Sequence, residues 1–235
     1  MQPARILVKK CWKCLFLLIC NLAAKTSFYW LCRGRDCVLQ RSVYLNRMDY
    51  LWTPWRYPYL VDADPGGRKG VPEALAAWTG DCHCVFCNLI AATRFAVEQG
   101  GSAVDADRAA NIVLRAEHSF IVLNAFPYSS GHVMIVPYDH QESLASLDRS
   151  TAHEIMTLAQ RTDAVLRQVY TPDGINMGLN LGKAAGAGVA GHLHMHVLPR
   201  WLGDSNFMTV IAETRVLPET LEATWERLRE GFARS

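Results

Sequence analysis

The sequence predicts an α+β fold with five short strands and two main helices. Short apolar runs rich in Ile and Val, bounded by turn residues, recur between residues 111 and 198 and are typical of strands. A longer stretch with a helical repeat interrupts these runs at residues 151–169, and a second helical stretch follows at 218–232. Strands joined mainly by short turns, with one long helix inserted late, favour an antiparallel sheet.

The five expected strands are recognised by their apolar runs and by the residues that end them. Two or three polar residues separate the first run from the second, which indicates a hairpin. The turn at 127–131 leads into the third strand, which Pro137 should end, and Pro199 should likewise end the fifth. In chain order, the strands are expected at residues 111–115, 120–124, 132–136, 175–181 and 192–198.

The two helices are predicted from apolar periodicity and from the residues near their ends. In the 151–169 stretch, apolar residues recur on one stripe, and the turn at 172–174 (Pro-Asp-Gly) should end the helix. Pro218 falls in the first turn of the C-terminal helix, where a missing N–H is tolerated. The apolar stripe of the longer helix consists of Ala152, Ile155, Met156, Ala159, Val165, Leu166 and Val169.

Charge and cysteine content separate residues 1–47 from the rest of the chain. This segment holds nine of the 24 Lys and Arg residues and one of the 22 acidic residues, a formal charge of +8, whereas residues 48–235 carry −6. Five of the eight cysteines also lie in it, and the other three cluster at 82–87. Because the main body has no cysteines spread out to cross-link distant elements, we expect a reduced, cytoplasmic protein.

Residues 1–47 are predicted to be a non-core extension. Basic residues precede an apolar run at 15–22, as in a signal peptide, but no small-residue cleavage site follows and the run is too short to span a bilayer. Met48 opens a different composition, so we favour Met48 as the natural start over a targeting segment or a functional extension. No membrane span is expected, and the negative main body argues against nucleic-acid partners.

The main body is expected to have two parts, an N-terminal arm at 48–108 and the principal domain with its C-terminal helix at 109–235. Stretches rich in Gly, Pro or Asp at 61–80 and 96–109 predict loops. A Cys-x-x-Cys lies in the arm at 84–87. Alone it is ambiguous between metal binding, redox chemistry and no function, because tetrahedral zinc needs two more ligands that spacing cannot select.

Three histidines alternate in the fifth strand, at His192, His194 and His196. Because side chains two residues apart share a face, these should project together, while Leu193 and Met195 point into the core. Adjacent imidazoles disfavour each other's charged form, so the group should stay largely neutral near pH 7 and can supply a nucleophile or metal ligands. A catalytic zinc site built from the three histidines is therefore an open alternative.

A loop of small residues at 182–191 immediately precedes the histidines. Glycine lets backbone N–H groups approach an anion closely and surround it. An anion site beside a neutral histidine is what nucleotidyl transfer needs, because positioning and electrostatic stabilisation carry most of such reactions. The glycines of this loop are Gly182, Gly186, Gly188 and Gly191.

The stretch His192-Leu193-His194-Met195-His196-Val197-Leu198 resembles the signature of the histidine triad (HIT) family. Its flanks are similar to the branch of diadenosine tetraphosphate phosphorylases and ATP adenylyltransferases, and the resemblance covers roughly residues 48–225. It implies one five-stranded antiparallel sheet with two helices, paired into a ten-stranded sheet in a homodimer. The matching segments are 51–56, 120–124, 131–140, 180–186 and 192–208.

The resemblance implies roles for individual residues. His194 would attack the α-phosphorus, His196 would hold phosphate oxygens and assist the leaving group, and His132 would help to orient that site. Asn124 would bind the ribose hydroxyls. Many relatives carry Ser or Gln where this chain has only the backbone of Gly188, and Lys183 would compensate with its charge. The residues implied along the polyphosphate are Asn180, Lys183, Gly186 and Gly188.

The resemblance also implies a structural zinc ion and no organic cofactor. In zinc-carrying members the ligands match Cys84, Cys87, His140 and His192. His192 is thus assigned to the metal, although strand alternation places it beside His194.

The expected activity is nucleotidyl transfer or hydrolysis on an adenine nucleotide or dinucleoside polyphosphate, such as diadenosine tetraphosphate. An adenylyl-His194 intermediate would be resolved by phosphate or by water. The alternatives are hydrolysis of nucleoside phosphoramidates within the same family, and a module that binds nucleotides or partner proteins without useful turnover.

Overall fold

The computed structural model describes residues 6–11, 14–21, 26–33, 36–43, 70–204 and 219–235. Contacts divide the chain into two units, Met1–Leu51 and Trp52–Ser235, and each is described by itself. Within the described residues, no helix is long and apolar enough to cross a membrane. The predicted start at Met48, the segment 51–56 and Pro218 lie outside the described residues.

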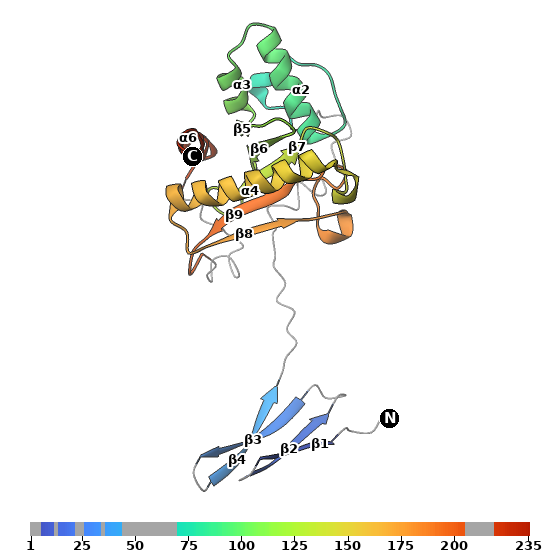
Figure 1. Ribbon diagram of the computed structural model, residues 1–235, viewed down its shortest axis with the longest axis vertical. Coiled ribbons are helices and arrows are strands. Elements are labelled where there is room, and N and C mark those ends of the chain that lie inside the picture. The colour runs from blue at the N-terminus through green and yellow to red at the C-terminus, as the bar shows by residue number, and fades with distance from the viewer. Residues whose placement is uncertain (1–5, 12–13, 22–25, 34–35, 44–69, 205–218) are drawn as a thin grey trace. The chain divides into compact units, whose positions relative to one another are not determined.

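The first unit contains a four-stranded antiparallel sheet in which each strand pairs with the next along the chain (Figure 1). The sequence patterns did not predict these strands. The apolar run at 15–22, with its signal-peptide layout, falls mostly in the second strand. The boundary after residue 47 stays a prediction. The strands are β1 (Ile6–Cys11), β2 (Cys14–Asn21), β3 (Thr26–Arg33) and β4 (Asp36–Val43).

The second unit is built on a five-stranded antiparallel sheet with the order β5-β6-β7-β9-β8. The predicted α+β class and the five strands are confirmed. The first two strands form the expected hairpin, with Ile112 opposite Val122. The strands are β5 (Ile112–Arg115), β6 (Ser119–Leu123), β7 (Val133–Pro137), β8 (Gly174–Leu179) and β9 (Met195–Arg200).

The last strand begins later and extends further than predicted. β9 starts at Met195, so His192 and His194 precede the strand instead of lying inside it. It also continues through Pro199, which pairs with β8. Pairing with β7 ends at Val197, so one side of β9 is unpaired beyond that residue and a proline is tolerated there.

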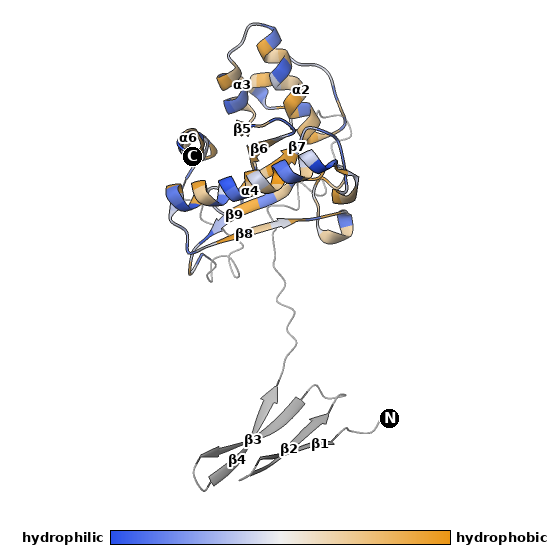
Figure 2. Ribbon diagram, in the orientation of Figure 1, coloured by the Kyte–Doolittle hydropathy of each residue, from blue (hydrophilic) through white to orange (hydrophobic). Residues whose placement is uncertain are grey.

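Two helices, α4 (Arg149–Tyr170) and α6 (Leu221–Ala233), cover one face of the sheet. Ile135 of β7 and Val197 of β9 are fully buried there against side chains such as Leu166 of α4. In Figure 2, α4 carries both hydrophilic and hydrophobic segments, as expected for an amphipathic helix that borders solvent. This helical layer supports the sheet from the side opposite the candidate site.

The ends of α4 explain why its periodicity was visible in the sequence. The Asp148 side chain accepts a hydrogen bond from the backbone N–H of Thr151 at the N-terminus, and Thr171 ends the helix with a left-handed φ of 44°. One member of the predicted apolar stripe is wrong, because Met156 is 56% exposed. The stripe is therefore narrower than the sequence indicated.

The other face of the sheet is covered by α2 (Val85–Glu98) and α3 (Ala103–Ala109). The loop predicted at 96–109 is therefore wrong, except for the short turn between the two helices. The Ser102 side chain caps α3 by accepting from the backbone N–H of Asp105. A helix this short has too few residues to display a helical repeat. The prediction of a loop therefore rested on the glycines and acidic residues of this segment.

Candidate active site and metal centre

Three histidines gather on the sheet face that α2 covers. His196 on β9 lies opposite Met134, which belongs to the core beneath α2. His132 precedes β7 by one residue, so alternation gives its side chain the same face. The ring centroids of His132 and His196 are 5.2 Å apart, and those of His194 and His196 are 4.9 Å apart. None of the three is more than 9% exposed.

For the neutral form of these rings, hydrogen bonds determine which nitrogen carries the proton. The backbone N–H of Tyr128 donates to Nδ1 of His132 at 3.1 Å, so this nitrogen carries a lone pair. Nε2–H of His132 can then donate to Nδ1 of His196, which lies 3.1 Å away. His196 consequently carries its own proton on Nε2 and can donate a hydrogen bond from that atom.

His194 takes the opposite tautomer. Its Nδ1 lies 2.8 Å from the backbone carbonyl oxygen of His192, and a carbonyl oxygen can only accept. Nδ1 of His194 therefore carries the proton, and the lone pair is on Nε2. The ring with a lone pair on Nε2 and the ring with an N–H at Nε2 are thus neighbours, with centroids 4.9 Å apart.

A pocket of about 760 Å³ opens beside these histidines. His194 and His196 line one end together with the backbone of Gly188 and Gly191. Further walls come from α2, the end of α3, the strands β6 and β7 and several loop residues. The volume and the mixture of apolar walls with a few polar groups are typical of small-molecule sites.

The middle of the pocket is an apolar slot. Met134 and Val122 line it from the sheet, and Phe86 and Leu89 line it from α2. All four side chains are at most 9% exposed. Flat aromatic groups bind favourably in such apolar surroundings, so the slot suits a nucleobase.

Asn124 lies where β6 ends, next to both the pocket and the histidines. Its side-chain oxygen accepts from the backbone N–H of Phe126 at 2.9 Å. Its side-chain nitrogen lies 3.4 Å and 3.5 Å from the two ring nitrogens of His132. The structure therefore places Asn124 within the pocket wall, as its predicted ribose contact requires.

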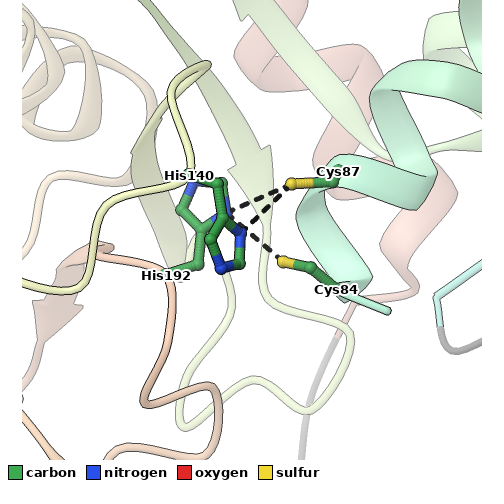
Figure 3. A group of neighbouring side chains, drawn as sticks. All are labelled: Cys84, Cys87, His140 and His192. Carbon is green, nitrogen blue, oxygen red and sulfur yellow. Dashed lines mark hydrogen bonds between the residues drawn. The ribbon is translucent and has the colours of Figure 1, made fainter. Parts of the chain in front are cut away.

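A second cluster joins Cys84, Cys87, His140 and His192 (Figure 3). One ligand atom from each residue lies within 4.8 Å of all the others. Cys84 precedes α2 and Cys87 lies in its first turn, whereas both histidines come from loops that flank strands. The four residues predicted as metal ligands are therefore brought together.

The distances in this cluster fit a tetrahedral metal site. Nδ1 of His192 lies 3.3 Å from Sγ of Cys84 and 3.6 Å from Sγ of Cys87, and Nδ1 of His140 lies 3.4 Å from Sγ of Cys87. Zinc bond lengths and tetrahedral angles separate sulfur and nitrogen ligands by about 3.6 Å. The donor set of two thiols and two imidazoles is also one that zinc prefers.

A hydrogen bond and burial leave His192 in the neutral form that can bind a metal through Nδ1. Its Nε2–H donates to the carbonyl oxygen of Pro137 at 2.9 Å, which leaves the Nδ1 lone pair for the metal. Burial lowers the pKa of His192 to about 4, so it is neutral at pH 7. Burial and the neighbouring Cys84 raise the pKa of Cys87 to about 12. Without metal this thiol keeps its proton, which a binding metal ion must displace.

His192 connects the two clusters. Its ring belongs to the cysteine cluster, while its carbonyl oxygen accepts from the nucleophile candidate His194. The ring of Phe86 lies 5.3 Å from the rings of both histidines. His192 therefore lies on the α2 side of the sheet like His194 and His196, as alternation predicts, although it precedes β9 and its ring contacts the cysteine cluster.

Other predicted site residues lie elsewhere. Asn180, Lys183 and Gly186 are not among the described residues that line the pocket. Lys183 is exposed in a short 3-10 turn, and Gly186 ends that turn with a φ of 88°. Of the glycine-rich loop, only its later part, including Gly188, reaches the pocket.

Several residues of the site were missed by sequence reasoning. Phe86 and Leu89 are three residues apart, as on one face of a helix, and they stand directly beside the Cys-x-x-Cys. This spacing was a usable signal for α2. The backbone N–H of Tyr128 and the carbonyl of Pro137 carry no such signal. Every residue type has a backbone carbonyl, and every type except proline has an N–H.

Comparisons with known proteins bear on this geometry. Residues 106–201 match the HIT domain. An AP-4-A phosphorylase of Mycobacterium tuberculosis (strain H37Rv) is 35% identical over 189 residues, which span 80% of this chain and 87% of the relative. The chain belongs to the HIT family.

Further members of the family show weaker similarity. A bis(5'-adenosyl)-triphosphatase of Dictyostelium discoideum is 31% identical over 93 residues, 40% of this chain and 62% of that protein. Among solved structures, a Zn-bound histidine triad family protein from Mycobacterium smegmatis is 28% identical with a TM-score of 0.47. It covers 64% of this chain and 94% of its own.

Proposed function

We propose that this HIT protein is a nucleotidyl transferase or hydrolase that acts on dinucleoside polyphosphates such as diadenosine tetraphosphate. The observation that carries the proposal is the hydrogen-bonding geometry of two neighbouring rings. His194 offers a lone pair on Nε2, and His196 offers a hydrogen on Nε2. The similarity to an AP-4-A phosphorylase supports the choice of substrate.

In the proposed reaction, Nε2 of His194 forms a bond to the α-phosphorus as the bond from that phosphorus to the leaving oxygen breaks. The imidazole becomes cationic and keeps its Nδ1–H, which the carbonyl oxygen of His192 stabilises. Nε2–H of His196 donates a hydrogen bond to the leaving oxygen, where negative charge develops. Phosphate or water then attacks the same phosphorus, and the bond from phosphorus to Nε2 of His194 breaks. When water attacks, the proton that it loses passes to solvent.

The tautomers favour phosphate over amine as the leaving group. His196 receives a hydrogen bond from His132, and His132 receives one from a backbone amide that cannot give up its proton. This series of hydrogen bonds between neutral rings therefore supplies a hydrogen bond to the leaving group without transferring a proton to it. An anionic phosphate departs without protonation, whereas the amine of a phosphoramidate needs a proton. Nucleoside phosphoramidate hydrolysis is thus the weaker alternative.

The nucleotide is proposed to lie along the pocket. The α-phosphate would contact the histidines and the backbone at Gly188, the ribose would lie near Asn124, and the base would enter the slot between Val122 and Leu89. Contacts of Asn180, Lys183 and Gly186 with the more distant phosphates stay predictions.

Zinc is proposed to be held by Cys84, Cys87, His140 and His192 as a structural ion. Bound there, it would cross-link the start of α2 to the segments after β7 and before β9. A catalytic metal held by the three alternating histidines is not supported, because Nδ1 of His192 is directed at the cysteines and Nδ1 of His194 is engaged with a carbonyl oxygen.

The covalent intermediate can be tested directly. Mass spectrometry after brief mixing of the protein with diadenosine tetraphosphate is expected to detect an acid-labile adenylyl adduct, and peptide mapping should place it on His194. Adding inorganic phosphate would separate phosphorolysis, which yields ADP, from hydrolysis, which yields AMP. Tight nucleotide binding with neither adduct nor product over hours would replace this proposal with a non-catalytic binding module.

We further propose a homodimer formed through the β8 edge of the sheet. Among the described strands, β8 pairs only with β9, and Met177 in this strand is 45% exposed. Antiparallel addition of a second copy would satisfy the free edge and create a ten-stranded sheet. Sedimentation velocity should show a dimer that Met177→Lys weakens, whereas a monomeric wild type at micromolar concentration would contradict this assembly.

A further inference from the structure

Asn111 lines the pocket at the junction of α3 and β5. It adopts a left-handed φ of 57°. Its backbone is fixed on both sides, because its N–H donates to the carbonyl oxygen of Arg108 at 3.1 Å and its carbonyl oxygen accepts from Leu123 at 2.9 Å. Leu123 immediately precedes Asn124, so the two asparagines stand next to each other in the pocket wall.

The amide of Asn111 has no hydrogen-bond partner among the residues that the structure describes. The residue is half-buried, and apolar side chains such as Leu89 and Val122 line the same pocket. Asn124 differs, since its side chain already accepts from a backbone N–H. A half-buried amide beside an apolar slot therefore offers one donor and one acceptor side to a ligand.

The register of the sheet places Asn111 at the start of β5, three strands away from His196 on β9. His196, Met134, Val122 and Ile112 lie opposite one another on four successive strands. Three strand spacings span about 14 Å. With the α-phosphate at the histidines, a ribose and base extend along this row toward β5, and the outer edge of the base arrives beside Asn111.

We propose that Asn111 selects adenine by pairing its amide with the exocyclic amino group and N7 of the base. The amide oxygen accepts from the amino group, and the amide N–H donates to N7, a pairing that an asparagine makes well. Guanine presents two acceptors on the same edge, so it cannot satisfy both sides of the amide. This inference rests on the proposed function, since it takes the pocket to be a nucleotide site.

A different result is expected if Asn111 serves only to adopt the left-handed conformation after α3. Asparagine and glycine are both favoured just after a helix in the left-handed conformation, so the residue would be replaceable by glycine without consequence for the ligand. Asn111→Gly therefore keeps the backbone geometry and removes only the amide. Thr171→Gly is a matched control, because Thr171 is left-handed after α4 and exposed.

The test is calorimetric binding of AMP, 7-deaza-AMP and GMP to wild type, Asn111→Gly and Thr171→Gly. Wild type and the Thr171 variant should bind AMP about 10-fold more tightly than either other nucleotide, and Asn111→Gly should reduce both preferences to about twofold or less. The inference is overturned if Asn111→Gly keeps the preference for AMP over the other two nucleotides, or if wild type lacks this preference. It is also overturned if wild type binds no AMP.

Because binding a monophosphate requires no covalent step, this measurement is independent of the adduct experiment. A missing adduct with an intact Asn111 effect would reject the proposed catalysis and leave the base contact standing. An adduct together with unchanged base preference would reject the base contact alone.

Discussion

His194→Ala is expected to lower turnover of diadenosine tetraphosphate by at least about 1,000-fold, because the variant has no atom that can bond to the α-phosphorus. His196 cannot substitute, since the Nδ1 of its ring accepts from His132 and its Nε2 carries hydrogen. The loss should fall on kcat, and the measurement is steady-state kinetics with product analysis at saturating substrate.

A matched histidine control is available on α4. His153 is exposed and does not line the pocket, so His153→Ala should turn over substrate like wild type. Binding of AMP to His194→Ala should remain within a few-fold of wild type, because the base slot and Asn124 are unchanged. Turnover by His194→Ala within about tenfold of wild type would remove this residue as the nucleophile.

Cys84→Ser is expected to abolish zinc binding and to lower the free energy of unfolding by about 3–5 kcal/mol, a fall in Tm of about 10 °C. Cys84 is 5% exposed, and its Sγ lies 3.3 Å from Nδ1 of His192. Loss of the metal frees His192, whose carbonyl oxygen orients His194. We therefore expect turnover to fall as well. Metal content, thermal unfolding and kinetics measure the three effects.

The exposed Cys82 supplies the control, and Cys82→Ser should retain zinc and stability. Zinc added to metal-free wild type at pH 7 should release the Cys87 proton, because the pKa of that thiol is raised to about 12. His192 should release none, since its pKa is lowered to about 4. Apparent affinity should therefore rise at least about tenfold per pH unit. Zinc retained by Cys84→Ser with unchanged stability would exclude Cys84 as a ligand.

The strands were predictable because each alternates or concentrates apolar residues between clear turns. The hairpin at β5 and β6 and the long helix α4 followed from such local patterns. The placement of Leu193 and Met195 in the core is confirmed as well. The family resemblance named all four residues of the cysteine cluster, which residue spacing could not select.

The remainder depended on contacts that no local pattern encodes. α3 is too short to show a helical repeat. α2 was not predicted because it lies in the segment 48–108, which was interpreted as an arm. The departure of His192 from the strand depends on its partners Cys84 and Pro137, which lie far away in sequence. The tautomers assigned to His194 and His196 depend on backbone groups, which are the same for nearly every residue type.

Helices that lie outside the family match help to cover both faces of the sheet. The family match spans residues 106–201, but α2 and both cysteines of the cluster precede it, and α6 follows it. A protein trimmed to the match would leave Phe120 and Val136 facing water on one side of the sheet. The segment that the family match spans is therefore smaller than the part of the chain that shields the sheet from water, and the flanking helices are needed to bury both of its faces.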